Sequence, residues 1–568
     1  MSILYPMSIR QIFLRPIARL GALHAQRQLR SFLASHRRTR SVQDKFLAEF
    51  LRAHSQTAFG QDHNLGQVRS YEDFRLAVPI TDYQYIQPYM SRVLHGEPGA
   101  LLPADQPVLM FSMTSGTTGE PKHIPVTPRF LADIRRGWNL FGVNVFGQHP
   151  RAWLRPLVQI SSFSSERLSP SGQPCGAISG LLASTQKRVV RWMYAVPQWV
   201  ASLADPTTRY YAILRHSIAR DVAFITTANP SSTIKLIETG QAQVERLIRD
   251  VRDGTFTPPE SDATNQTGLP KNISANFKPN PALAARLEAG LARDGQLLPK
   301  HFWNVEFLTN WTGGTLSLYL RRLRELFPGA AIHDIGLLAS EGRFSVPLEP
   351  NTPSGVAEIT SNFLEFIPAD ERQQSQPKTL RADELDVGGE YFLVVTNWAG
   401  LYRYNLDDRV RVTGFIGQTP TFEFLSRGTC TANITGEKIT EHQVVAAMAQ
   451  ARRQTGCDIE RFVLQGRFCR SGEPCYELRI ERADGLDPQV LAQRMDDALA
   501  RLNIEYASKR KDGRLGPIRP CPMQPGSFAQ AERQTILERP GRGEQYKHQY
   551  LLTDIIDEGG SEGSQQVE

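Results

Sequence analysis

The segment Phe111-Ser-Met-Thr-Ser-Gly-Thr-Thr-Gly-Glu-Pro-Lys122 places small hydroxyl residues, two glycines and a lysine in one short turn. Residues 107–113, before and into the turn, form a compact apolar run that is typical of a buried strand. We therefore expect the turn to lie at the carboxyl end of a strand, where open α/β sheets bind their ligands. This position favours a functional site.

The residue types of this turn suit a polyphosphate. Because glycine carries no Cβ, the backbone N–H groups of Gly116 and Gly119 can approach phosphate oxygens closely. Lys122 adds a compact positive charge. Further hydroxyl donors are Thr114, Ser115, Thr117 and Thr118. The spacing disfavours a Walker A motif, which ends in adjacent Gly-Lys-Ser/Thr, and a flexible surface loop remains the alternative.

Length and composition indicate a large multidomain globular protein. The chain has 568 residues, of which 40% are hydrophobic and 22% charged, and no apolar run approaches membrane-spanning length. Its six cysteines are scattered without a Cys-x-x-Cys pair, so neither a zinc site nor a disulfide framework is indicated. These features predict a protein of the reducing cytoplasm.

Positive charge is concentrated in the amino-terminal arm, residues 1–40. The arm contains eight arginines and no lysine or acidic residue, so subtracting its +8 from the net charge of +7 leaves about −1 for the other residues. A near-neutral body lacks the broad basic surface that nucleic acids require, so we expect no nucleic-acid partner. Three interpretations of the arm stay open: a solvated helix packed on the domain, which we favour, a contact with an anionic membrane, or an organelle transit peptide.

The middle of the chain alternates strand-like runs with helices, which is the pattern of an α/β fold. Residues 222–228 and 305–311 are predicted strands. Each precedes a predicted helix, over 230–238 and 316–327 respectively. We therefore predict a large α/β domain with mixed β-sheets and helices over residues 41–427.

Two further predicted strands end in segments that suit a nucleotide. One finishes in Ser340-Glu341-Gly342, whose carboxylate suits Mg²⁺, since hard divalent cations prefer carboxylate, water and phosphate oxygens. Another, over 391–397, is followed by a polar segment that ends in Asp408, and an alternating strand then starts at Arg409. We expect Asp408 to accept hydrogen bonds from ribose hydroxyls. A surface turn is the alternative for Ser340-Glu341-Gly342.

A smaller domain is predicted after Arg427-Gly428, where the composition changes. Thr440-Glu-His-Gln443 has the pattern of a capping box at the start of a helix. Two strands and a long helix over 487–510 follow, which together predict a small α+β unit. We place this mobile C-terminal domain at residues 428–557 and a disordered tail at residues 558–568.

These ordered blocks resemble the GH3 (auxin-responsive) family of acyl-acid amido synthetases, within the adenylate-forming enzyme superfamily. The likeness runs from about residue 41 to residue 549. It is carried in order by Thr57-Ala-Phe-Gly60, by Tyr71-Glu-Asp-Phe74 with Val78-Pro79, and by the turn before Lys122. Thr57-Ala-Phe-Gly60 itself is expected to end a helix. The resemblance implies a large adenylate-forming domain followed by a small mobile one.

The resemblance also implies roles for individual residues. The turn that begins at Thr114 and ends at Lys122 would bind the ATP phosphates, and Glu341 would hold Mg²⁺. The other nucleotide contacts that it implies are Ala339, Ser340, Tyr402, Arg403, Asp408 and Arg427. Two lysines distant from this turn, Lys438 and Lys547, are implied to act in catalysis.

The activity implied by the resemblance is an ATP-dependent ligase that forms a carbon–nitrogen bond. A small carboxylic acid is activated as an acyl adenylate with release of pyrophosphate, and an amine, expected to be an amino acid, then displaces AMP. ATP and Mg²⁺ are the implied cofactors. Two alternatives stay open: an acid-thiol ligase of the acyl-CoA type, and a nucleotide-binding regulator without turnover.

Overall fold

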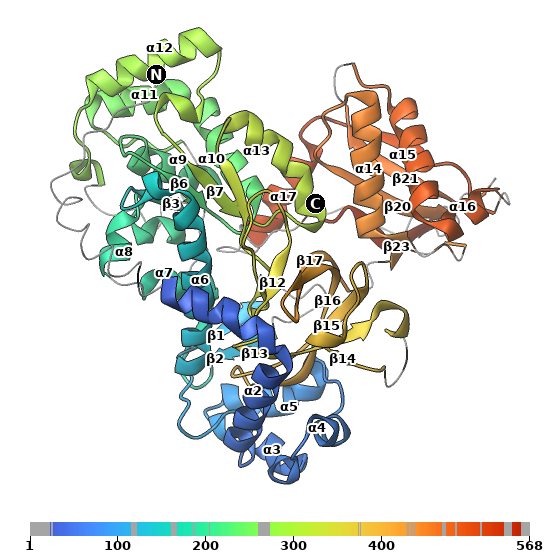
Figure 1. Ribbon diagram of the computed structural model, residues 1–568. Coiled ribbons are helices and arrows are strands. Elements are labelled where there is room, and N and C mark those ends of the chain that lie inside the picture. The colour runs from blue at the N-terminus through green and yellow to red at the C-terminus, as the bar shows by residue number, and fades with distance from the viewer. Residues whose placement is uncertain are drawn as a thin grey trace. The chain divides into compact units, whose positions relative to one another are not determined.

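The computed structural model describes residues 23, 26–114, 122–160, 167–185, 188–203, 205–259, 273–372, 374, 377–428, 431–432, 434–435, 437, 439–468, 473–482, 485–511, 514–538 and 548–557. The chain divides into two compact units (Figure 1). The described residues up to 313 and over 320–424 form the first unit, and those over 314–319 and from 425 onward form the second. The predicted domain limits, 41–427 and 428–557, stay predictions.

Helix starts in the first unit follow directly from the sequence. In α4 (Tyr71–Ala77) a capping box joins the Ser70 hydroxyl to the Asp73 N–H, and the Asp73 carboxylate to the Ser70 N–H. In α5 (Tyr83–Leu94) the carboxylate of Asp82 accepts a hydrogen bond from the first turn. Such side chains satisfy backbone donors that have no partner within the helix.

Several longer helices share a start in which a capping side chain precedes a proline of the first turn. The capping residues are Thr127, Asp205, Asn229 and Asn280. Further helices of the first unit are α2 (Thr39–His54), α3 (Ala58–Asp62), α6 (Pro128–Gln148), α7 (Ile178–Ser184), α8 (Arg188–Met193), α9 (Pro206–Ser217), α10 (Pro230–Ala242), α11 (Val244–Asp253), α12 (Pro281–Asp294) and α13 (Leu320–Leu326). None of the helices that the structure describes combines the length and apolarity needed to cross a membrane.

A four-stranded parallel sheet confirms the predicted α/β alternation. Its order is β3-β6-β7-β8, with strands β3 (Leu157–Gln159), β6 (Phe224–Thr226), β7 (Phe307–Asn310) and β8 (Ala331–Asp334). Helix α10 follows β6 and α13 follows β7, as the sequence pattern predicts. A second sheet of order β2-β1-β5-β4 contains β1 (Met110–Thr114), β2 (Lys122–Val126), β4 (Arg167–Leu168) and β5 (Pro174–Gly176).

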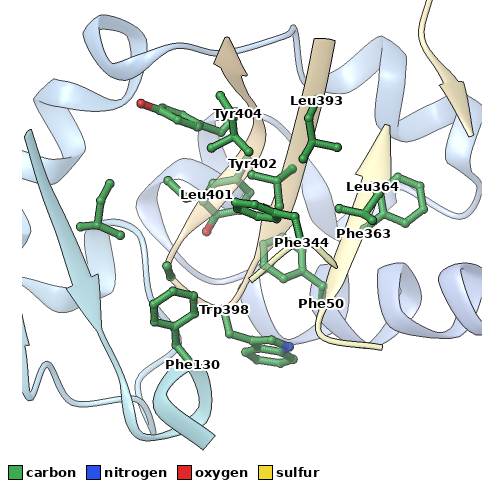
Figure 2. Close-up of a cluster of buried hydrophobic side chains, with 14 of the residues drawn as sticks. Phe50, Phe130, Phe344, Phe363, Leu364, Leu393, Trp398, Leu401, Tyr402 and Tyr404 are labelled. Carbon is green, nitrogen blue, oxygen red and sulfur yellow. The ribbon is translucent and has the colours of Figure 1, made fainter. Parts of the chain in front are cut away.

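The seven-stranded sheet carries the core of the first unit. Its order is β11-β12-β17-β16-β15-β13-β14. The strands are β11 (Ser345–Val346), β12 (Gly355–Ala357), β13 (Asn362–Pro368), β14 (Leu380–Arg381), β15 (Glu390–Asn397), β16 (Leu401–Ile416) and β17 (Thr419–Arg427). Figure 2 shows the side chains gathered there, where the Phe50 ring lies 5.9 Å from Trp398 and 5.2 Å from Tyr402. Helix α2, which carries Phe50, thus packs against the β15–β16 connection.

The prediction for the segment before Arg409 was wrong. Residues 401–408 form the first half of β16 instead of a separate polar segment before it, and the strand does not begin at Arg409. Arg403 and Asp407 have positive φ angles of 45° and 60° within this strand. These irregular positions, accompanied by register shifts against β15, interrupt the alternation that would identify a strand from sequence.

The prediction for Thr57-Ala-Phe-Gly60 was also wrong. This segment starts α3, because the Thr57 hydroxyl accepts a hydrogen bond from the Gly60 N–H at 2.9 Å. Gly60 lies inside the helix and does not cap the previous one. A Cβ at Gly60 would lie 2.1 Å from the carbonyl oxygen of His54, so the glycine allows a close approach between two helices.

The second unit is a small α+β arrangement, as predicted. Its capping box at Thr440 is confirmed, and the helix ends at Gly456, whose φ of 70° suits glycine. The predicted long helix is two helices, since Asn503 between them has extended backbone angles. The sheet order is β22-β21-β20-β23. Its elements are β18 (Thr431–Ala432), β19 (Ile439–Thr440), α14 (Glu441–Thr455), β20 (Phe462–Phe468), β21 (Cys475–Glu481), α15 (Pro488–Leu502), α16 (Ile504–Lys511), β22 (Arg519–Met523), α17 (Ser527–Glu538) and β23 (Leu551–Asp557).

The described end of the basic arm packs on the first unit. Phe32 is buried in a cluster with residues of α6 and β12. The carbonyl oxygen of His36 accepts a hydrogen bond from the Gln418 N–H at 2.7 Å, and the hydroxyls of Thr39 and Thr419 lie 2.6 Å apart. These contacts support the interpretation of residues 32–40 as a segment packed on the domain. The predictions for residues 1–22 lie outside the described residues.

Candidate active site

The strands that flank the predicted phosphate-binding turn form an antiparallel hairpin. Strands β1 and β2 pair from Met110 with Val126 to Thr114 with Lys122. The turn therefore leaves the carboxyl end of β1, as expected, and returns in the adjacent strand. Its residues Ser115, Gly116, Thr117, Thr118 and Gly119 lie outside the described residues. Their contacts with phosphate stay predictions.

Lys122 begins β2 and reaches two tyrosines. Its Nζ donates to the Tyr404 hydroxyl at 3.4 Å and lies 5.6 Å from the centroid of the Tyr83 ring. The Tyr83 hydroxyl in turn accepts from the backbone N–H of His123 at 2.9 Å. A cation is attracted to the face of an aromatic ring, so the tyrosines orient the ammonium group without neutralising it. The arrangement suits a lysine that binds an anionic group.

Ser340 connects the second predicted element to the first. The hydroxyl of Ser112 on β1 donates to the Ser340 hydroxyl at 2.9 Å, across 228 residues of sequence. Ser340 lies in the turn between β9 (Leu338–Ala339) and β10 (Gly342–Arg343), which form a short hairpin. Ala339, which is half-buried, pairs with Gly342 in that hairpin. Strand β1, which leads into the predicted phosphate-binding turn, and the segment that contains Ser340 and Glu341 thus come together.

Glu341 occupies the same turn and is buried. Its backbone carbonyl accepts a hydrogen bond from the Asn397 side-chain amide at 2.7 Å. The next residue, Gly342, has a φ of 151°, and a Cβ there would lie 3.2 Å from side-chain atoms of Asn362 and Asn397. This close packing fixes the backbone that carries the Glu341 carboxylate. A single carboxylate is a chemically suitable protein ligand for Mg²⁺ when phosphate oxygens supply the rest.

Arg403 is placed differently from what its predicted role suggests. Its guanidinium is buried against the carboxylate of Glu365, with Nη2 2.8 Å and Nε 3.0–3.1 Å from the carboxylate oxygens. Arg403 also donates to the carbonyl oxygen of Val78 at 2.8 Å. The neighbouring Glu365 raises the pKa of Arg403, because it stabilises the charged guanidinium more than burial destabilises it. These contacts support a positioning role for Arg403, and direct contact with a nucleotide stays a prediction.

Tyr402 and Asp408 lie on the same strand as Arg403. Tyr402 is buried in the core, its hydroxyl donates to the carbonyl oxygen of Leu101 at 2.7 Å, and burial raises the pKa of that hydroxyl. The carboxylate of Asp407 pairs with Arg372 at 2.7 Å. Asp408 is instead buried. The adjacent carboxylates of Asp407 and Asp408 therefore have different surroundings, and the backbone between them is irregular because Asp407 has a positive φ.

The predicted residues of the second unit are mostly outside the described part of the chain. Lys438 and Lys547 both lie outside it. Arg427 is exposed at the end of β17. Beside Lys438, the buried carboxylate of Glu437 accepts hydrogen bonds from the N–H groups of Ile434 and Thr435 at 2.7 and 2.8 Å, and from Tyr476. The backbone that leads into Lys438 is therefore held by a buried carboxylate.

Sequence reasoning missed Arg343 of β10, whose side chain fixes the β9–β10 hairpin to neighbouring backbone and to Trp138. Its Nη1 donates to the carbonyl oxygens of Ile335 at 2.9 Å and Ser345 at 3.3 Å. The guanidinium lies 4.6 Å from the Trp138 ring, and burial lowers its pKa to about 10. Ser112 and Asn397 were also missed. No local pattern marks these residues, because Ser112 and Asn397 bond to segments distant in sequence and the Arg343 guanidinium packs on Trp138 of α6.

Comparison with known proteins was made for the whole chain. The GH3 family N-terminal domain matches residues 28–332, the GH3 family central domain matches residues 356–427, and the GH3 family C-terminal domain matches residues 442–555. Together these matches span both compact units.

Curated relatives and a solved structure extend over most of the chain. A 4-substituted benzoates-glutamate ligase GH3.12 from Arabidopsis thaliana is 24% identical over 518 residues, covering 86% of this chain and 89% of that protein. A jasmonoyl–L-amino acid synthetase GH3.5 from Oryza sativa subsp. japonica is 23% identical, covering 86% and 88%. The solved structure of AtGH3.15 acyl acid amido synthetase in complex with 2,4-DB superimposes with a TM-score of 0.80 at 21% identity, covering 93% and 94%. That superposition confirms the predicted fold class, and the family matches over both units confirm that the chain belongs to the GH3 family.

Proposed function

We propose that this chain is an ATP-dependent acyl acid amido synthetase. A carboxylate oxygen of the acid attacks the α-phosphorus of ATP, the bond from that phosphorus to the bridging oxygen breaks, and pyrophosphate leaves. An amine then attacks the acyl carbon of the adenylate, AMP leaves with the electron pair of the carbon–oxygen bond, and the amine loses a proton. The products are an amide, AMP and pyrophosphate.

One observation carries this proposal. Ser112 binds Ser340, and Lys122 binds Tyr404, so two hydrogen bonds join three segments that the sequence separately predicts to bind ATP. The strands that flank the predicted phosphate-binding turn, the turn that carries Glu341 and the strand that carries Asp408 therefore lie in one region of the first unit. GH3 membership supports the same reaction, and the names of the curated relatives bear out amide formation as its class.

In this reaction the chain's main task is to position groups and stabilise charge. The Lys122 ammonium, oriented by Tyr83 and Tyr404, would stabilise the negative charge that spreads over the phosphoryl oxygens. Glu341 and phosphate oxygens would hold Mg²⁺, which supplies charge neutralisation when bound. Asp408 would fix the ribose. The buried surroundings of Glu341 and Asp408 favour strong electrostatic contacts there.

An amino acid is the amine that we propose as acceptor. The names of the two curated relatives each contain an amino-acid substrate, glutamate in one and an L-amino acid in the other. A small carboxylic acid is proposed as the other substrate, and the cytoplasm as the location. The acid-thiol ligase alternative shares the first half-reaction, so only the acceptor separates it.

The test is acid-dependent exchange of pyrophosphate into ATP, followed by release of AMP with each acceptor. A panel of carboxylic acids is screened first, and the active acid is then combined with amino acids or with coenzyme A. We expect exchange with at least one acid and AMP release with amino acids alone. If no acid of the panel supports exchange, the ligase assignment is overturned. If AMP is released with coenzyme A and not with amino acids, the protein is a thiol ligase.

A pair of lysine variants makes the test residue-specific. Lys122→Ala is expected to lower exchange by about a hundredfold, the scale of losing one preorganised electrostatic contact. Lys45→Ala removes an exposed lysine from α2 and serves as the control. Equal exchange in the two variants would remove Lys122 from the site.

A further inference from the structure

A cavity of about 610 Å³ lies in the first unit. It is bounded by α9, by residue Val251 of α11, by the segment 194–201 and by the segment 276–280. One wall is Gln159 and Ile160, at the end of β3. None of the described residues that we assign to the ATP site lines it. Its volume is within the range of pockets that hold small organic ligands.

The charged side chains that line the cavity are all basic. They are Arg191, Arg209, Arg215, Arg220 and Lys278. Among the described lining residues there is no aspartate or glutamate. The rest of the lining is largely apolar, with Ile213, Val251 and Phe277 among its members. Basic groups beside an apolar surface match a ligand that has both an acidic and an apolar part.

Arg209 is the most informative of these residues. It is only 2% exposed, and its Nε has no hydrogen-bond partner. Within the described part of the chain its guanidinium forms no ion pair, and its nearest aromatic ring, that of Tyr210, is 5.9 Å away. A buried charge without a partner is unfavourable, because it has lost its hydration without compensation. Such a side chain on a cavity wall points to an anionic partner that enters from solution.

The neighbouring basic groups reinforce the positive character of the cavity. Arg215 donates to the carbonyl oxygens of Thr255 at 2.9 Å and Asp250 at 2.8 Å, and its guanidinium lies 4.0 Å from the Phe277 ring. Burial lowers the pKa of Arg220. Burial, with Arg215 and Arg220 nearby, lowers the pKa of His216 to about 4, so His216 is neutral at pH 7.

The carboxylate that acts electrostatically on Arg215, that of Asp250, is already engaged. Asp250 accepts hydrogen bonds from the Tyr211 hydroxyl at 2.7 Å, from the Thr255 hydroxyl at 2.6 Å, and from the N–H and hydroxyl of Thr257. It acts electrostatically on Arg215 but does not line the cavity. Asp250 therefore leaves Arg209 without a described counterion.

We propose that this cavity binds an amphipathic organic anion. Its carboxylate or phosphate contacts Arg209, and its apolar body packs on Ile213, Val251 and Phe277. The planar guanidinium binds either acidic group through two parallel hydrogen bonds. The site goes beyond the proposed ligase reaction and does not rest on it, because binding can be measured without turnover.

Anilinonaphthalene sulfonate, a fluorescent aromatic anion, is a suitable probe for the full-length protein. The neutral N-phenylnaphthylamine has nearly the same aromatic body without the acidic group and is the matched control. Wild type should bind the anionic probe at least about tenfold more tightly than the neutral one, the scale of one charge-assisted contact. Phenylacetate and phenyl phosphate are then used as competitors, and the stronger of the two identifies the preferred acidic group.

Variants assign the binding to Arg209. Arg209→Met should weaken the anionic probe by about tenfold or more, and Arg209→Lys should recover part of that loss. Arg249→Met removes an exposed arginine from α11, which also carries Val251, and should leave binding unchanged. Because Arg209 is buried without a described counterion, ligand-free Arg209→Met should unfold at or above the wild-type temperature.

Two results would overturn the proposal. The first is equal affinity of the wild-type protein for the charged and the neutral probe, which would show that only the apolar surface of the cavity contributes to binding. This comparison requires no variant. The second is unchanged probe affinity in a folded Arg209→Met variant. If that variant also unfolds at a lower temperature than wild type, Arg209 is a structural residue.

Discussion

The buried ion pair between Arg403 and Glu365 allows the predicted role of Arg403 to be tested directly. The sequence placed Arg403 among the nucleotide contacts, whereas its guanidinium is bound to Glu365 and to the Val78 carbonyl. Both side chains are almost fully buried, at 4% and 1% exposed. If Arg403 only positions β16, a variant that lacks the Arg403 charge but keeps the fold stable should still bind ATP.

The magnitude follows from what each substitution leaves behind. Arg403→Met leaves Glu365 buried with the hydroxyls of Tyr71 and Thr379 as described donors, at 3.0 and 2.9 Å. Removing one partner of a buried pair costs about 3–5 kcal/mol, because the other charge stays uncompensated. The double variant Arg403→Met with Glu365→Leu removes both charges. We expect its stability to lie within about 2 kcal/mol of wild type.

Urea unfolding followed by tryptophan fluorescence measures this stability. All seven tryptophans precede residue 400, so the signal reports the first unit. ATP affinity is measured on the same proteins by equilibrium dialysis. A positioning role predicts weak ATP binding in Arg403→Met and near-wild-type binding in the double variant. A stable double variant that fails to bind ATP would refute the positioning role and establish direct contact.

Three further predictions address other parts of the chain. Burial lowers the pKa of His54 from 6.5 to about 4, so the unfolded chain takes up a proton first and stability falls as pH drops through this window. His54→Gln should remove about 2.5 kcal/mol of that loss, measured as the difference in urea stability between pH 7.5 and 4.5, and an unchanged pH dependence would contradict the lowered pKa. Deletion of residues 1–22 should leave exchange activity largely intact, whereas deletion of residues 1–40 should destabilise the first unit, because Phe32 and His36 are buried in it; equal stability of both truncations would refute this. Lys547→Ala should lower ATP–pyrophosphate exchange by about a hundredfold and spare conversion of a supplied acyl adenylate to amide, and an equal loss in both assays would refute a role confined to adenylation.

Local structure in this chain was largely predictable because its signals are local. The capping box at Thr440 involves residues within four positions and starts the expected helix, and the same kind of local signal starts the helices after Ser70 and Thr127. The alternation of strands and helices likewise predicted the parallel sheet. Prediction failed where the reason for a residue lies outside its own short motif. Gly60 resembles a helix end, but its lack of a side chain is required by the His54 carbonyl oxygen.

The candidate site shows the same division. Its residue types were identifiable from short motifs, but their surroundings were not. Arg403 has a positive φ, and the strand that contains it, β16, was not predicted to include this residue. The Glu365 carboxylate that binds Arg403 lies in a different strand, β13. Whether the guanidinium faces a ligand or the core is decided by that pairing, which no motif records. The roles assigned to individual site residues therefore stay predictions.

Long-range contacts also determine how loss of activity should be interpreted in this site. The Ser112–Ser340 and Lys122–Tyr404 bonds span 228 and 282 residues, and Asn397 holds the Glu341 backbone from another strand. Removing Ser112 or Asn397 would shift Ser340 or Glu341, which are predicted to contact the nucleotide and its cation, although Ser112 and Asn397 are not predicted to contact either. Such changes leave the Glu341 carboxylate present, so they should weaken exchange and raise the Mg²⁺ requirement less than loss of that carboxylate does. The metal dependence, rather than the rate alone, therefore separates residues that bind the nucleotide and its cation from residues that hold them in place.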